Sequence, residues 1–138
     1  IIKGVITNKQ SRTKQMIEKY FQSRNHNKEF FKELQLKATV LFKNLSSAWR
    51  YKDTRSILEL MEEHNLLMQE LNTKYHLGIY TDEHKDLENL ASESGLFYKP
   101  SGAGGGDLGF ILSDSEIKVK KLLMKIKKKN LEVIDLRD

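Results

Sequence analysis

Several residue types and patterns are missing from this sequence, and each absence narrows what the protein can be. The 138 residues include no cysteine, so the chain forms no disulfide and uses no thiolate, which fits a reducing cytoplasm. No apolar run approaches the roughly 18 residues of a membrane span, so we expect no membrane partner. The sequence shows no signal-peptide pattern and begins at Ile1, so we expect a fragment or excised domain that acts in the cytoplasm.

Glycine and proline are nearly confined to one stretch. KPSGAGGGDLG (99–109) holds five of the eight glycines and the only proline, whereas the rest of the chain is rich in Lys, Glu and Leu. Glycine tolerates positive φ, and consecutive N–H groups in such a loop can converge on an anion. Ser101 adds a hydroxyl and Lys99 a positive charge. The stretch therefore predicts a phosphate-binding loop. The alternative is a plain connecting loop, for which one or two glycines would suffice.

Two common nucleotide-binding motifs are absent. The P-loop pattern G-x-x-x-x-G-K-[ST] does not occur. The dinucleotide-binding glycine motif follows a strand and opens a helix, whereas the glycines here precede a predicted strand. The loop is therefore expected to bind phosphate in another way.

The formal net charge of +5 comes largely from KVKKLLMKIKKKN (118–130). Its apolar residues recur at i, i+3, i+4 and i+7, which predicts an amphipathic helix with a solvated lysine face. A face that binds a polyanion is the alternative. No aromatic residue or arginine accompanies the lysines, as base stacking or bidentate readout would require, so we expect no nucleic-acid partner.

The apolar spacing also predicts the other elements. Helical spacing places helices in 11–24, 27–53, 53–76, 78–95 and 118–130. Short β-branched or apolar runs predict strands in 1–8, 108–113 and 131–136. The two long helices are expected to lie antiparallel, since little more than YKD separates them. We therefore predict a single α+β domain over 1–138, with helices packed on one face of a small, mostly antiparallel sheet.

The four histidines do not form a recognisable site. His64 lies on the apolar stripe of a predicted helix, which favours a buried, hydrogen-bonded histidine over a metal ligand. His26, His76 and His84 are scattered at predicted helix ends and turns, and no pair has metal-ligand spacing. We therefore predict no metal ligand and assign no catalytic residue to this chain.

At the glycine loop the sequence resembles a known family. KPSGAGGGDLGFILS (99–113) resembles the third, C-terminal motif of the GHMP small-molecule kinases, which include galactose, homoserine, mevalonate and phosphomevalonate kinases. GVITNKQSRTKQMIEKY (4–20) is similar to the strand, loop and helix that open the C-terminal domain of these enzymes. The resemblance spans the whole chain in layout, and the glycine motif is its specific part.

The resemblance implies a two-domain kinase with its active site in the cleft between the domains. The N-terminal domain, absent from this chain, would bind ATP and Mg²⁺, and this chain would supply the facing wall and be inactive alone. Backbone N–H groups of the loop would position the phosphorylated substrate or the transferring phosphoryl group. The residues implied in phosphate or substrate binding are Lys99, Ser101, Gly102, Ala103, Gly104, Gly105, Gly106 and Asp107. Because like charges repel, Asp107 is expected to anchor the loop or orient an acceptor group.

Within the family, the motif is most similar to that of phosphomevalonate kinases. An aspartate after the glycine triplet and a K-P-S before it, as in Ser101 and Asp107, carry this likeness. The expected reaction is transfer of the ATP γ-phosphoryl group to 5-phosphomevalonate, in isoprenoid precursor synthesis. VITNKQSRTK (5–14) is equally close to mevalonate kinases, and Leu108 departs from the small residue usual at its position. Mevalonate kinase is therefore one alternative, and a non-catalytic basic helical module that binds nucleic acid or another acidic partner is the other.

Overall fold

The computed structural model describes residues 1–10, 12–102 and 104–136. The described elements run in the order β1 (Ile2–Ile6), α1 (Thr13–His26), α2 (Lys28–Arg50), α3 (Thr54–Tyr75), α4 (Asp82–Glu93), β2 (Phe97–Pro100), β3 (Leu108–Leu112), α5 (Glu116–Lys127) and β4 (Glu132–Asp135). The chain divides into two compact units. We call Ile1–Thr13 with Gly78–Asp138 the sheet unit, and Lys14–Leu77 the helical unit. The predicted α+β class is confirmed.

The sheet unit contains a four-stranded sheet in the order β2-β3-β1-β4. Every pair of neighbouring strands is antiparallel. Ile111 lies opposite both Lys3 and Tyr98, and Val5 lies opposite Gly109. Opposite residues share a face in an antiparallel pair and side chains alternate along a strand, so Val5, Tyr98 and Ile111 point to the same side.

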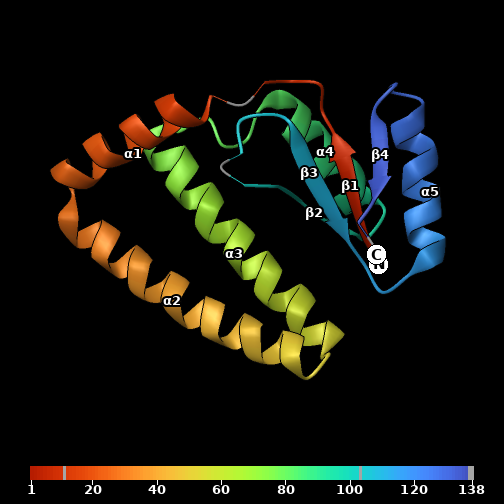
Figure 1. The fold of residues 1–138 in the computed structure, drawn as a ribbon, viewed down its shortest axis with the longest axis horizontal. Helices are drawn as coiled ribbons and strands as arrows, with labels where there is room; N and C mark the ends of the chain where they lie inside the picture. Colours follow the sequence, from red (N-terminus) through yellow and green to blue (C-terminus); the bar gives the residue numbers. More distant parts are fainter. Residues whose placement is uncertain (11, 103, 137–138) are drawn as a thin grey trace. The chain divides into compact units, whose positions relative to one another are not determined.

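Helices α4 and α5 cover that side of the sheet, beside the strands in Figure 1. Together with Val5, Tyr98 and Ile111, they enclose a core in which side chains are almost completely shielded from water. The helices contribute Leu87, Ala91, Leu122 and Ile126 to it. Burying each large apolar side chain contributes roughly 1.5–3 kcal/mol, so this cluster is a main source of the unit's stability.

Strand β2 was not predicted. The LFYKP segment (96–100) was expected only to lead into the glycine loop. Proline cannot donate a ladder hydrogen bond and is tolerated on edge strands. Since β2 lies at the edge of the sheet and pairs only with β3, Pro100 fits there.

The lysine-rich segment is the helix α5, as predicted. Val119, Leu122 and Ile126 are buried. The lysines of the segment are all exposed: Lys118, Lys120, Lys121, Lys125, Lys127, Lys128 and Lys129. The interpretation of this face as solvated is therefore confirmed for the chain as it stands.

The helical unit holds α1, α2 and α3. Figure 1 shows α2 and α3 as an antiparallel pair joined by a tight turn of residues 51–53. Asp53 caps α3 by accepting hydrogen bonds from the N–H and the hydroxyl of Ser56, at 3.1 and 2.7 Å. These hydrogen bonds lower the pKa of Asp53. The antiparallel arrangement agrees with the prediction.

The apolar stripes of the helical unit are only partly buried. Phe31, Ile57 and Leu71 are buried, whereas Phe42 and Trp49 are each 58% exposed. The apolar residues at helical spacing on α2 are therefore not all buried in this unit. Two packed helices bury a narrow seam between them, so residues beside the seam on α2 remain exposed.

Candidate functional site

The glycine loop connects β2 to β3 at one end of the sheet. Ser101 donates its N–H to the carbonyl of Leu108 at 2.9 Å, which continues the strand pairing into the loop. Gly102, Gly104, Gly105 and Gly106 all have positive φ, as does Asp107. The predicted site residues Lys99, Ser101, Gly102, Gly104, Gly105, Gly106 and Asp107 thus lie on β2 and in the loop that follows it, whereas Ala103 lies outside the described residues.

Two of the glycines are required by the chain's own packing. A Cβ on Gly104 would lie 2.6 Å from the carbonyl oxygen of Ile79, and one on Gly106 would lie 2.6 Å from that of Lys9. Gly102 differs, because a Cβ there would meet no atom within 4 Å. The high glycine content is thus partly explained by the close approach of the loop to two neighbouring backbone segments.

The loop is anchored to the end of β1. Asp107 donates its N–H to the carbonyl of Lys9, and its own carbonyl accepts from the N–H of Thr7 at 2.7 Å and from its hydroxyl at 3.2 Å. Asp107 therefore anchors the loop through its backbone. A role for its carboxylate in orienting a substrate stays a prediction.

Two of the N–H groups predicted to bind an anion already donate hydrogen bonds within the protein in this conformation. Gly104 donates its N–H to Ser101 at 3.1 Å, and Gly105 donates to the carbonyl of Ile79 at 2.8 Å. Donors already bonded to protein carbonyls cannot also hold a phosphate without releasing them. Among the loop glycines this leaves the N–H groups of Gly102 and Gly106, whose contact with phosphate stays a prediction.

Lys99 is a half-buried lysine on β2, two residues before Ser101. Its Nζ lies 5.3 Å from the centre of the Phe110 ring. Burial lowers the pKa of Lys99, because it disfavours the charged ammonium. An anion beside it would offset this cost, so the environment of Lys99 suits the predicted phosphate contact.

Sequence reasoning missed the buried histidine beside the loop. His84, near the start of α4, is completely buried, whereas His64, which was expected to be the buried one, is half-buried. His84 contacts Tyr98 through Nδ1 at 2.7 Å and the Gly106 carbonyl through Nε2 at 3.2 Å. Burial lowers its pKa. No sequence signal joins residues 84, 98 and 106, because they meet only when α4 packs against β2 and the loop that follows it.

A second polar contact lies near the same end of α4. Lys9 and Glu83 form an ion pair with Nζ and Oε1 2.8 Å apart. The hydrogen bond from Lys9, with help from backbone donors, lowers the pKa of Glu83 to about 2. Because Lys9 also accepts from Asp107 through its carbonyl, this pair links α4 to the segment that anchors the loop.

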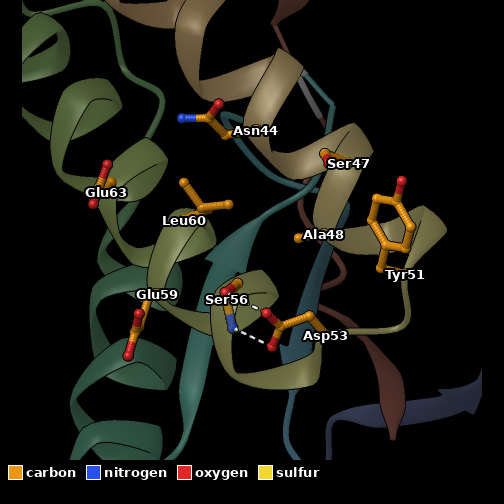
Figure 2. A pocket seen from close by; sticks show the side chains of 9 residues that line it. All are labelled: Asn44, Ser47, Ala48, Tyr51, Asp53, Ser56, Glu59, Leu60 and Glu63. Atoms are coloured by element: carbon orange, nitrogen blue, oxygen red, sulfur yellow. Dashed lines mark hydrogen bonds between the residues drawn. The ribbon is translucent and has the colours of Figure 1, made fainter.

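The helical unit has an open pocket of about 400 Å³ near the turn between α2 and α3, which Figure 2 shows from close by. Its lining includes Asp53, Glu59 and Glu63, and Asp53 is already engaged with Ser56. Acidic side chains around an open groove do not by themselves make a binding site. We therefore assign no function to this pocket.

The part of the chain that the structure describes contains neither a candidate metal cluster nor a helix suited to cross a membrane. Within residues 1–10, 12–102 and 104–136, no group of three or more His, Asp or Glu side chains is arranged to hold a metal ion. In that same part of the chain, none of the helices combines the length and apolar character needed to span a bilayer.

Comparisons with known proteins agree with the geometry. Residues 28–132 match the family model described as GHMP kinases C terminal. No curated protein matches the chain in sequence. The matched range covers most of the chain and includes the glycine loop.

Solved structures share the fold at low sequence identity. A Lin0012 protein from Listeria innocua superposes with a TM-score of 0.90 at 22% identity, covering 98% of this chain. L. major mevalonate kinase in complex with R-mevalonate gives 0.78 at 18% identity and 93% coverage. Streptococcus pneumoniae phosphomevalonate kinase in complex with phosphomevalonate and AMPPNP gives 0.77 at 23% identity and 97% coverage. The chain spans only 38% of the length of each of these three.

Proposed function

Because the chain belongs to the GHMP kinase family through the family's C-terminal domain, we propose that residues 1–138 form the substrate-side domain of an ATP-dependent small-molecule kinase. The glycine loop would hold the phosphate end of the substrate or the transferring phosphoryl group. The observation that carries this proposal is the rigidly anchored loop of positive-φ glycines at the sheet end, within the range that matches the family model.

The chemistry of phosphoryl transfer suits such a loop. Transfer depends mainly on positioning and on stabilising negative charge, so a wall of backbone donors contributes without containing a base. Gly102 and Gly106 offer N–H groups, Ser101 a hydroxyl and Lys99 a cation next to the loop. We therefore propose these residues as the phosphate contacts, with Gly104, Gly105 and Asp107 shaping the loop.

We propose 5-phosphomevalonate as the acceptor. The support is the stretch from Lys99 to Asp107, whose K-P-S and aspartate are most like those of phosphomevalonate kinases. The fold likeness to the S. pneumoniae enzyme with phosphomevalonate bound agrees, with a TM-score of 0.77. Mevalonate is the second candidate, supported by VITNKQSRTK (5–14), which is equally close to mevalonate kinases.

ATP and Mg²⁺ are assigned to a partner domain rather than to this chain. No described cluster of carboxylates or histidines here fits a metal ion, and the sequence carries no P-loop. The relatives are longer, since this chain spans 38% of their length. We propose that an N-terminal domain of the same protein completes the kinase, and that the complete enzyme acts in the cytoplasm.

Steady-state kinetics of the complete protein test this proposal. With Mg-ATP, 5-phosphomevalonate should be phosphorylated with a higher kcat/KM than mevalonate, and Lys99→Met should raise the KM for the phosphorylated acceptor. Preference for mevalonate would move the protein to the second candidate. No turnover of either acceptor, together with steeply salt-dependent DNA binding lost on changing the α5 lysines to glutamine, would favour the basic module instead.

A further inference from the structure

A buried chain of contacts in the sheet unit runs from Tyr98 through His84 to Gly106 in the glycine loop. Tyr98 on β2 reaches His84 on α4, and His84 reaches the carbonyl of Gly106. Gly109 on β3 makes room for the first contact, because a Cβ there would lie only 2.0 Å from the Tyr98 hydroxyl oxygen. Both side chains are buried, so water does not compete for these hydrogen bonds.

The partners determine which ring nitrogen of His84 carries the proton. A carbonyl oxygen can only accept, so Nε2 must be protonated and donate to Gly106. In the neutral ring Nδ1 is then an acceptor, and it receives the hydroxyl proton of Tyr98. Each donor meets one acceptor, and the neutral ring is also the form that burial favours.

This contact holds one peptide plane at both of its ends. The Gly106 carbonyl and the Asp107 N–H belong to the same planar peptide group. His84 holds the carbonyl, and the carbonyl of Lys9 holds the N–H. The torsions that rotate this peptide are ψ of Gly106 and φ of Asp107, and Gly106, which has no Cβ, places little steric restriction on its side of the peptide. Fixing this peptide plane restricts ψ of Gly106 and φ of Asp107.

We propose that His84 and Tyr98 are positioning residues, which clamp the Gly106 peptide and so hold the glycine loop in the conformation that receives the substrate phosphate. This inference rests on the proposed function of the loop. The clamp touches no substrate. It acts through Gly106, whose own N–H, on the preceding peptide, is one of the two donors proposed for phosphate binding.

Three variants separate positioning from simple stability. Tyr98→Phe keeps the aromatic ring and removes the hydroxyl. His84→Leu removes both hydrogen bonds, whereas His84→Gln retains a side-chain N–H that can reach the Gly106 carbonyl. Ile126→Val is the matched control, because it loosens the same core from α5 without touching the clamp.

The readouts are kcat/KM of the complete kinase with Mg-ATP and 5-phosphomevalonate, the melting temperature, and hydrogen exchange of the loop amides. Tyr98→Phe and His84→Leu should lower kcat/KM by about ten- to a hundredfold and speed exchange at Asp107, since a small misplacement of a site is costly. His84→Gln should recover part of this loss. Ile126→Val should lower the melting temperature and leave kcat/KM unchanged. Nitrogen-15 spectra of the ring should show the Nε2–H tautomer at neutral pH.

Two kinds of failure can be distinguished. If Tyr98→Phe and His84→Leu keep wild-type kcat/KM and loop exchange while the wild-type enzyme is active, the clamp is only structural and the inference is wrong. An Nδ1–H tautomer would also overturn it. If instead the wild-type enzyme turns over neither acceptor, the proposed function fails, and faster Asp107 exchange in Tyr98→Phe alone decides whether the clamp exists.

Discussion

The sheet unit and the helical unit bury their apolar residues to different extents. Val5, Ala91, Ile111 and Leu122 in the sheet unit have no exposed surface. In the helical unit Leu71 is among the better buried residues, while Leu66 is 64% exposed on α3. The glycine loop, which closely approaches neighbouring backbone segments, belongs to the sheet unit, whose core is closed.

This difference indicates a division of roles within the chain. A site that positions phosphate needs a rigid support, and a close-packed core transmits little motion to the loop it carries. A pair of helices with an exposed apolar surface tolerates substitution there at small cost. A substitution in the closed core should therefore cost more stability than one on the exposed helical surface.

Truncating an apolar side chain should lower the free energy of unfolding by different amounts in the two units. Ile111→Ala in the sheet unit should lower the free energy of unfolding by about 2–5 kcal/mol, because it leaves a cavity in a closed core. Leu66→Ala in the helical unit should change it by less than about 0.5 kcal/mol, as for most exposed positions. Urea unfolding of both variants measures this. Equal losses would show that the two units do not differ in packing.

Alanine substitutions at two glycines of the loop should lower the stability by different amounts. Gly104→Ala should cost about 2–4 kcal/mol, because positive φ is strained and the new methyl group meets the Ile79 carbonyl. Gly102→Ala, in open space, should cost only about 1 kcal/mol from its φ. Thermal unfolding gives both values. If Gly102→Ala lowers the stability as much as Gly104→Ala, the space around Gly102 is not open.

The sheet unit should lose stability in mild acid because of His84. Burial lowers its folded pKa below the ordinary 6.5, so between the two values the unfolded chain binds more protons. The free energy of unfolding should therefore fall as the pH drops below 6.5, by at most about 1.4 kcal/mol per pH unit. The hydrogen bond to the Gly106 carbonyl and the negative charges of Glu83 and Asp107 partly oppose this lowering of the His84 pKa. His84→Gln should flatten the slope in urea unfolding between about pH 7.5 and 5.5, and an unchanged slope would assign it to another group.

Substitutions on the lysine face of α5 should have the smallest effects on stability and on kcat/KM. Changing Lys127 and Lys128 to glutamine should alter stability by less than about 0.5 kcal/mol and leave kcat/KM unchanged, because both are exposed. Lys129 forms an ion pair with Asp86, with Nζ and Oδ2 3.4 Å apart, so changing it to glutamine should lower the stability slightly more. Melting curves and kinetics of the complete enzyme test this. A large rise in the acceptor KM would contradict the solvated-face interpretation.

Periodicity predicted much of the fold. The helices and three of the strands follow local patterns, and residues 51–53 separate α2 from α3 as expected. Strand β2 could not be predicted, because its identity depends on pairing with β3 rather than on its own composition. Phe42 and Trp49 recur at helical spacing yet are exposed, since helical spacing defines a face but does not show whether another element covers it.

The candidate site was predictable in part. Composition singled out the glycine loop, and the structure adds that Gly104 and Gly106 pack against carbonyls of distant segments. His84 and Tyr98 escaped notice because nothing in the sequence distinguishes them, and they come into contact only when α4 packs on β2. Contacts between distant segments leave no periodic signal, so local patterns cannot reveal them.

The central claim is that the glycine loop of the sheet unit binds the substrate phosphate. The most direct test is a titration of the complete kinase, labelled with nitrogen-15 glycine, with 5-phosphomevalonate in the presence of Mg-ADP. The amide resonances of Gly102 and Gly106 should shift, while those of Gly78 and Gly95, which lie outside the loop, should stay in place. Saturable binding that leaves Gly102 and Gly106 unmoved, or moves all four equally, would contradict the claim.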